Sequence, residues 1–242
     1  MDIGLTTVSN LIAQTHIILL AGEVTSFRND TDREIVFRQE SNFYYLSGCT
    51  VPSSFLLATY RAGAQSPWVE LFIPEADLAD MMWSVPPPSL EAAKETHDVT
   101  KIDHLPALPV AIEGLIKAHP DALFHTLLRN SPLFPVLPEE HVNQILGHEG
   151  GAITDLYLLS ALHRARLTKD AGEIEAIQHA NAISSRAHEV VMRVLGLAVR
   201  GKIERGKGVD VDKPLLPSEW LIEKEAEAEA IFVASCRREG YE

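Results

Sequence analysis

Basic residues are scarce in this chain relative to acidic ones. Its 242 residues include 21 Lys and Arg against 34 Asp and Glu, which gives a formal net charge of −13 with the histidines neutral. A general nucleic-acid binder needs a clustered Lys/Arg surface that neutralises phosphates. The charge balance therefore argues against nucleic acid as a partner.

Cysteine is equally scarce. The sequence holds Cys49 and Cys236, which are far apart and outside any Cys-x-x-Cys spacing. This excludes a disulfide framework and a zinc–thiolate cluster, and it favours a reducing compartment. A catalytic cysteine needs a positioned histidine, and no spacing implies one. Arg237 and Arg238 follow Cys236, but near a helix end they complement the helix dipole.

Long hydrophobic runs are also missing. The stretch NLIAQTHIILLAGE (residues 10–23) has no basic region before it. Its apolar part covers about ten residues, which is too short to span a bilayer. We interpret it as a helix end followed by a buried strand, and we expect a cytoplasmic protein with no membrane partner.

The common catalytic motifs are absent. The sequence has no His-Glu-x-x-His, no Gly-x-Ser-x-Gly, no phosphate loop and no dinucleotide fingerprint. Its histidine pairs lack the spacing and the acidic neighbours of a metal site, so each histidine is expected to be exposed or hydrogen-bonded. The pairs considered are His97 and His104 around a DVTKID turn, His119 and His125, His141 and His148, and His179 and His188.

Apolar runs and helical periodicities alternate over the first two thirds of the chain. Residues 16–23 read as a strand buried on both faces, and residues 54–61 and 68–74 as a hairpin around the turn AGAQS. Ser89 is a plausible cap for a helix LEAAKE, residues 107–120 form a helix pattern ending before Pro120, and DALFHTL is a further strand. This alternation predicts an α/β domain over residues 1–160.

From about residue 152 the pattern becomes helix-compatible for some forty-five residues. Ile174, Ile177, Ala180, Ile183 and Ala187 recur at helical spacing, and Thr168 or Asp170 could cap the helix start. The stretch of residues 200–219 reads as an exposed loop. Ser218 is expected to cap a last helix with an apolar line, which Gly240 ends. That line is Leu221, Ala228, Phe232 and Cys236.

The segment FRQESNFYY (residues 37–45) mixes charged and aromatic side chains and has two interpretations. It could be a binding patch made by Arg38, Glu40, Asn42, Tyr44 and Tyr45. It could instead be a strand with Phe37, Phe43 and Tyr45 packed inward and Arg38 paired to a carboxylate, and base rates for such mixed stretches favour this second interpretation.

Three blocks of sequence resemble one protein family. FRQESNFYYLSGCTVPSSFLLATY and LFIPEADLADMMWSVPPPSLEAAKETHDVTKID resemble the N-terminal domain of the Xaa-Pro aminopeptidase and prolidase family. RARLTKDAGEIEAIQHANAISSRAHEVVM is similar to the family's linker and first catalytic-domain helix, and EAEAEAIFVASCRREG to its second helix. The resemblance covers nearly the whole chain from about residue 16, with the blocks in the family's order.

The resemblance implies a mixed-sheet, creatinase/prolidase-type α/β domain with a ribonuclease-H-like arrangement, followed by part of a pita-bread metallopeptidase domain. On this basis we expect an N-terminal domain at residues 1–160, a linker at 161–172 and the start of the catalytic domain at 173–242. The family hydrolyses the peptide bond before proline in peptides, and family dimers make a homodimer possible. Its reaction uses two metal ions, commonly manganese, held by two Asp, one His and two Glu.

The chain departs from the family at the metal site. It has no Asp after Asp212 and no His after His188. No catalytic, metal or substrate-binding residue can be assigned, and Asp155 and Asp170 do not fall in the family's motifs. Residues 200–217 form a longer connection than the family usually has, as an unspliced intron or a real insertion would produce.

Three functions remain open. The chain is either an inactive product of an Xaa-Pro aminopeptidase gene, a non-catalytic partner of a full-length relative, or a binding module derived from an aminopeptidase. We expect residues up to about 160 to be well ordered and the C-terminal part to be less well packed.

Overall fold

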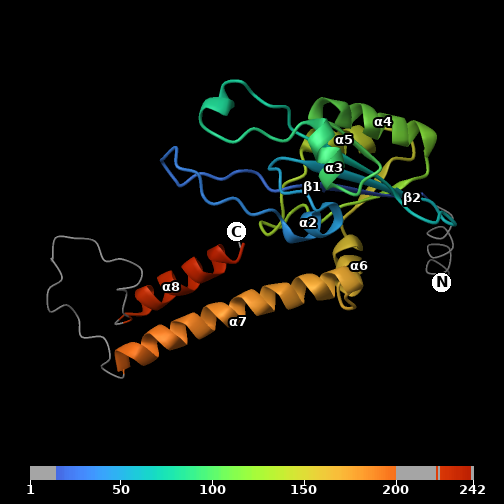
Figure 1. Cartoon of the computed structure of the whole chain (residues 1–242). Helices are drawn as coiled ribbons and strands as arrows, with labels where there is room; N and C mark the ends of the chain where they lie inside the picture. The colour runs from blue at the N-terminus through green and yellow to red at the C-terminus, as the bar shows by residue number, and fades with distance from the viewer. Residues whose placement is uncertain (1–14, 200–221, 223, 241–242) are drawn as a thin grey trace. The chain divides into compact units, whose positions relative to one another are not determined.

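The computed structural model describes residues 15–199, 222 and 224–240, and Figure 1 shows their arrangement. The chain divides into two compact units, Met1–Leu167 and Thr168–Glu242, and each is described by itself. None of the helices among the described residues is both long enough and apolar enough to cross a bilayer.

The first unit is built on a mixed sheet of six strands in the order β4-β3-β2-β1-β5-β6. The strands are β1 (His16–Ala21), β2 (Phe55–Tyr60), β3 (Trp68–Ile73), β4 (Lys101–His104), β5 (Leu123–His125) and β6 (Ala152–Thr154). Strand β2 is antiparallel to both β1 and β3, whereas the pairs β3–β4, β1–β5 and β5–β6 are parallel. The expected α/β fold with a mixed sheet is confirmed.

Helices cover both faces of this sheet, with α4 on one side and α2 and α6 on the other (Figure 1). The helices of the unit are α2 (Ser41–Ser47), α3 (Leu90–Thr96), α4 (Leu108–Ala118), α5 (Glu139–Leu146) and α6 (Leu158–Ala165), with 3-10 turns η1 (Asp80–Met82) and η2 (Leu105–Ala107). One core joins the sheet to α4 and α5, and a second joins it to α2, α3 and α6.

Strand β1 contributes to both cores. Ile17 and Leu19 pack with α4, whereas Leu20 packs on the opposite face. Because side chains alternate across a strand, a strand buried on both faces needs a continuous apolar run. The run HIILLA supplies it, which confirms the predicted strand.

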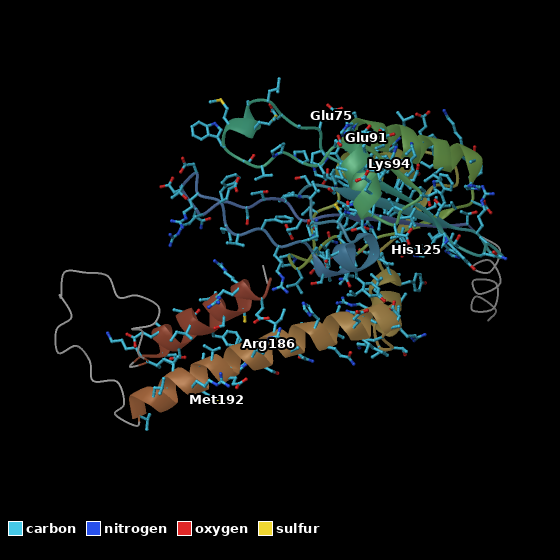
Figure 2. All side chains as sticks on the ribbon, viewed as in Figure 1. Glu75, Glu91, Lys94, His125, Arg186 and Met192 are labelled. Carbon is cyan, nitrogen blue, oxygen red and sulfur yellow. The ribbon has the colours of Figure 1, made fainter. Side chains whose placement is uncertain are left out.

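Several other predicted elements are confirmed. Strands β2 and β3 pair as the expected hairpin, and α4 ends at Ala118, two residues before Pro120. Ser89 caps α3 because its Oγ accepts a hydrogen bond from the Ala92 N–H. Glu91 in the first turn of α3 and Lys94 in its last turn complement the helix dipole (Figure 2).

Three local predictions are wrong. The favoured strand over residues 37–45 is helix α2 preceded by extended chain, and the DVTKID turn contains strand β4. The long helix-compatible stretch from residue 152 contains strand β6 and helix α6, and its next helix starts only at Ala171. Helix α6 overlaps the expected linker at 161–172, and the predicted domain limits stay a prediction.

The described part of the second unit contains helices α7 (Ala171–Val199) and α8 (Glu225–Arg238). Asp170 caps α7 by accepting from the Glu173 N–H, while Glu173 accepts from the Asp170 N–H. Of the predicted caps, Asp170 is therefore the right one. Ile183 and Ala187 of α7 form a small core with Cys236 of α8.

The predicted C-terminal end of α8 is confirmed, whereas its predicted start is not. Gly240 follows the helix with φ +88°, as expected of a C-terminal cap. Ser218 and Leu221 lie outside the described residues, and α8 begins at Glu225 after Lys224 as its N-cap. Arg186 of α7 donates to Glu239 at 2.7 Å, and Figure 2 shows it alongside α8.

Candidate functional site

Gln39 is the third residue of FRQESNFYY (residues 37–45), called the FRQ segment below, and its side chain is buried. Its side-chain oxygen accepts from the backbone N–H of Glu23, at 2.6 Å, and from that of Glu40, at 3.0 Å. Its side-chain nitrogen donates to the carbonyl of Val51 at 3.2 Å. One amide thus ties together the end of β1, the start of α2 and the loop before β2.

Gly22 makes this arrangement possible through close backbone approach. Its N–H donates to the Ser54 carbonyl at 2.7 Å. A Cβ on Gly22 would lie 3.0 Å from that carbonyl oxygen and 3.1 Å from the side-chain amide of Gln39. A Cβ there would force the Ser54 carbonyl and the Gln39 side chain to shift by a few tenths of an ångström.

Glu40 explains why the segment becomes helical. One carboxylate oxygen accepts from the N–H groups of Asn42 and Phe43, at 2.9 and 2.7 Å, and the other accepts from the Asn42 side chain. Gly48 closes the helix with φ +63°, and its N–H donates to the Tyr44 carbonyl. These caps override the strand propensity of the aromatic residues.

Arg166, just after α6, links this segment to a distant part of the unit. Its guanidinium donates to the side-chain oxygen of Asn42 at 3.2 Å and lies 5.2 Å from the centre of the Tyr45 ring. The stacking adds a cation–π attraction to the hydrogen bond. Asn42 is therefore satisfied on both ends of its amide.

The proposed binding patch is only partly exposed. Asn42 is buried, whereas Arg38, Tyr44 and Tyr45 are exposed and Glu40 is half-buried. The interpretation with Tyr45 packed inward is wrong, although Phe43 is buried as expected. Among residues 15–199, 222 and 224–240, Arg38 forms no ion pair with a carboxylate. The FRQ segment thus serves mainly to hold neighbouring parts of the fold together.

Two segments of the first unit expose large apolar side chains. The segment 78–85 carries Leu78, Met82, Trp83 and Val85, with exposed fractions of 82%, 77%, 86% and 93%. The second segment, 27–36, exposes Phe27, Ile35 and Val36. Figure 1 shows both loops extending beyond the sheet on the same side. Apolar side chains that gather on one exposed segment are candidates for an interaction surface.

A histidine pair joins β1 to β5. His16 aligns with Leu123, and Ile18 with His125, so both histidines share one face of the sheet. His16 Nδ1 and His125 Nε2 are 3.0 Å apart, and the ring of Tyr157 lies 6.4 Å from that of His125. Burial, with a smaller contribution from His16, lowers the pKa of His125 to about 4. His125 is labelled in Figure 2.

Sequence spacing did not reveal this pair, because the two histidines are 109 positions apart. The nearer pairs behave differently. His141 is buried edge-on against Phe55, and its burial lowers its pKa. His188 bonds to the carbonyl of Ser184 in its own helix.

The metal ions implied by the family find no ligand set in the described part of the chain. There, no group of three or more His, Cys, Asp and Glu is arranged to hold a metal. Asp155 lies 3.7 Å from the guanidinium of Arg129, and Asp170 caps α7. These two carboxylates serve structural roles, and the described residues do not fit a dinuclear manganese centre.

Both cysteines are free thiols and are buried. Burial raises the pKa of the Cys49 thiol, and the Val51 N–H and the Ser54 hydroxyl only partly offset this. A buried thiol with a raised pKa stays protonated at neutral pH and is unreactive. Cys49 is therefore a core residue.

Comparisons with known proteins identify the family of this fold. Residues 6–124 match the family model for the aminopeptidase P N-terminal domain. A probable Xaa-Pro aminopeptidase of Paracoccidioides brasiliensis is 31% identical over 225 residues, which cover 93% of this chain and 40% of the relative. One of Aspergillus niger is 32% identical over 176 residues, covering 73% and 33%.

Solved structures agree on the fold. Aminopeptidase P of E. coli superposes with a TM-score of 0.66 at 17% identity, covering 96% of this chain and 48% of that one. The Pseudomonas aeruginosa aminopeptidase PepP gives 0.64 at 22% identity, with the same two shares. The chain spans less than half the length of the curated relatives it matches, 40% in the case of the Paracoccidioides brasiliensis protein. Through its N-terminal domain, this chain belongs to the Xaa-Pro aminopeptidase family.

Proposed function

We propose that this chain provides the N-terminal domain of an Xaa-Pro aminopeptidase, which removes the residue before proline from peptides. The observation that supports this most is the match of residues 6–124 to the aminopeptidase P N-terminal domain. The fold is consistent with this match, because the six-stranded sheet and the hydrogen bonds of the Gln39 side chain fix the FRQ segment in place.

The chemistry of the family rests on two metal ions, commonly manganese, that activate a bridging water. Hard divalent ions of this kind prefer several carboxylate ligands. The described residues do not bring such a set together. We therefore propose that the 242 residues do not hydrolyse peptides by themselves and contribute a folded domain to the peptidase.

An assay on an Xaa-Pro peptide tests both parts of this proposal. The purified chain is incubated with MnCl₂ and the peptide, with E. coli aminopeptidase P as the positive control. We expect no release of the N-terminal residue. Turnover that a chelator abolishes would show that the chain is an active metallopeptidase.

The exposed segment 78–85 favours association of the chain with a second copy. Met82 and Trp83 expose most of their apolar surface, and burying that surface between two copies would be favourable at roughly 25 cal/mol per Å². A homodimer built on this segment is our proposal for the chain's main protein partner. If the chain acts as a non-catalytic partner, the same segment would bind it to a full-length relative.

Sedimentation of the purified chain measures this association. We expect a dimer that W83D converts to monomer, since a charge in a buried apolar contact is costly. V110D is the matched control, because Val110 is an exposed apolar residue on α4. A monomeric wild-type chain, or equal dissociation by both variants, would refute the proposal.

We also propose a cytoplasmic location, which the two free thiols support because secreted proteins usually pair their cysteines. Cell fractionation with an antibody against the chain provides the test. Recovery in a secreted fraction would contradict it.

A further inference from the structure

His16 and His125 bring two imidazole nitrogens close together on the neighbouring strands β1 and β5. The parallel pairing of β1 and β5 sets His16 diagonally opposite His125 on one face of the sheet. His16 Nδ1 and His125 Nε2 are 3.0 Å apart, and the ring centres are 5.2 Å apart with a tilt of 39°. Both side chains are half-buried, so the point between them remains within reach of a small ion.

We propose that His16 Nδ1 and His125 Nε2 together bind one divalent transition-metal cation of the zinc type, with water completing the coordination. Zn–N bonds of about 2.0–2.1 Å at a tetrahedral angle separate two ligand nitrogens by about 3.3 Å. The observed 3.0 Å is close to this value, and a small rotation of the rings makes up the difference. Imidazole suits zinc, nickel and copper rather than magnesium or calcium.

The hydrogen bond between the rings also suits a metal. Ligand histidines must be neutral, and a bond between two ring nitrogens requires that one of them accept, so at least one ring already presents a lone pair at this point. In the unbound pair one N–H donates to the other nitrogen. On binding, that proton moves to the other nitrogen of its own ring, and both lone pairs then point at the cation.

A third aromatic ring lies beside the pair. Tyr157, before α6, presents its ring edge-on to His125, with 6.4 Å between the ring centres. Strand backbones hold both ligands, which makes the pair more rigid than one on loops.

Calorimetric titration of the full chain with ZnCl₂ in a non-chelating buffer tests the proposal. We expect one tight equivalent per chain in the wild type and its loss in H16Q and in H125Q. H163Q is the matched control, because His163 is an exposed histidine on α6, and it should keep the tight equivalent. MgCl₂ should give no comparable heat. Retention of the tight equivalent in H125Q would overturn the proposal.

A second measurement needs no substitution and so avoids any folding defect of the variants. Ring ¹⁵N–¹H correlation spectra of the wild-type chain are recorded as ZnCl₂ is added. We expect the first equivalent to shift Nδ1 of His16 and Nε2 of His125 before any other histidine. A first equivalent that shifts other histidines and leaves these two unchanged would refute the site.

Discussion

Gln39 carries three hydrogen bonds on one buried amide, two of them from backbone N–H groups. Replacing it with leucine keeps its approximate size but leaves the N–H groups of Glu23 and Glu40 without this acceptor. An unpaired buried donor costs about 1–3 kcal/mol. We expect Q39L to lower the free energy of unfolding by that amount or more in urea denaturation.

Arg38, directly before Gln39, offers the control for this experiment. Its side chain is exposed, so R38A should change the free energy of unfolding by less than about 0.5 kcal/mol. If Q39L and R38A were equally mild, the three bonds of Gln39 would not hold the segment together.

His141 predicts how stability depends on pH. Burial lowers its pKa in the folded state, so the unfolded chain takes up a proton at a higher pH than the folded chain does. The unfolded state then binds more protons as pH falls below about 6.5, and stability rises with pH through this window. We expect H141Q to flatten the slope of unfolding free energy against pH between pH 5 and 7.

Gln144 lies on the same helix as His141 and does not titrate, which makes Q144A a suitable control. Its slope against pH should match that of the wild type. Identical slopes for H141Q and the wild type would mean that another group governs acid stability.

The sequence pointed to the FRQ segment, but it did not reveal which contacts its residues make. The partners of Gln39 at Glu23 and Val51 lie 16 and 12 positions away, and folding alone brings them to it. The histidine pair is a stronger case, because its members meet only after β1 and β5 align in register. Local spacing contains no trace of such contacts.

Replacing glycine with alanine should change stability in opposite directions at the end of one helix and in the middle of another. Gly48 ends α2 with φ +63°, a conformation that costs other residues about 1 kcal/mol, although a Cβ there would meet open space. Gly114 lies exposed inside α4, also with open space around it. Inside a helix, alanine is better than glycine by about 0.5–1 kcal/mol.

We therefore expect G48A to destabilise the chain and G114A to stabilise it, each by about 1 kcal/mol. Thermal unfolding of both variants beside the wild type provides the measurement. Changes of the same sign would show that backbone conformation does not decide either position.

Long elements were easier to predict than short ones for a physical reason. Strands β1, β2 and β3 have six residues each, enough for an apolar run to stand out. Strands β4 and β6 have four and three residues and lie at the two edges of the sheet. So few residues show no periodicity, and neighbouring strands rather than local sequence define them.

For the entire chain, the sizes of the buried cores predict how strongly backbone amides are protected. In the first unit, two apolar clusters flank the sheet. In the described part of the second unit, the core consists of Ile183, Ala187 and Cys236, with Phe232 beside them. Since protection follows burial, hydrogen exchange should be slowest in β1 and β2 and markedly faster in α7 and α8.

Exchange followed by mass spectrometry resolves these segments in one experiment. Equal protection of the sheet and of α7 would contradict the expectation. It would mean that contacts outside the small core of the second unit hold α7 in place.

The parallel pairing of β1 with β5 has a consequence for synthesis on the ribosome. Strand β1 emerges first and can pair with β2 early, but its other edge waits for β5, about a hundred residues later. At 5–20 residues per second this interval lasts about 5–20 s. An open, apolar strand edge invites pairing with other chains. The nascent chain therefore passes through a period in which a chaperone that shields β1 would raise its yield.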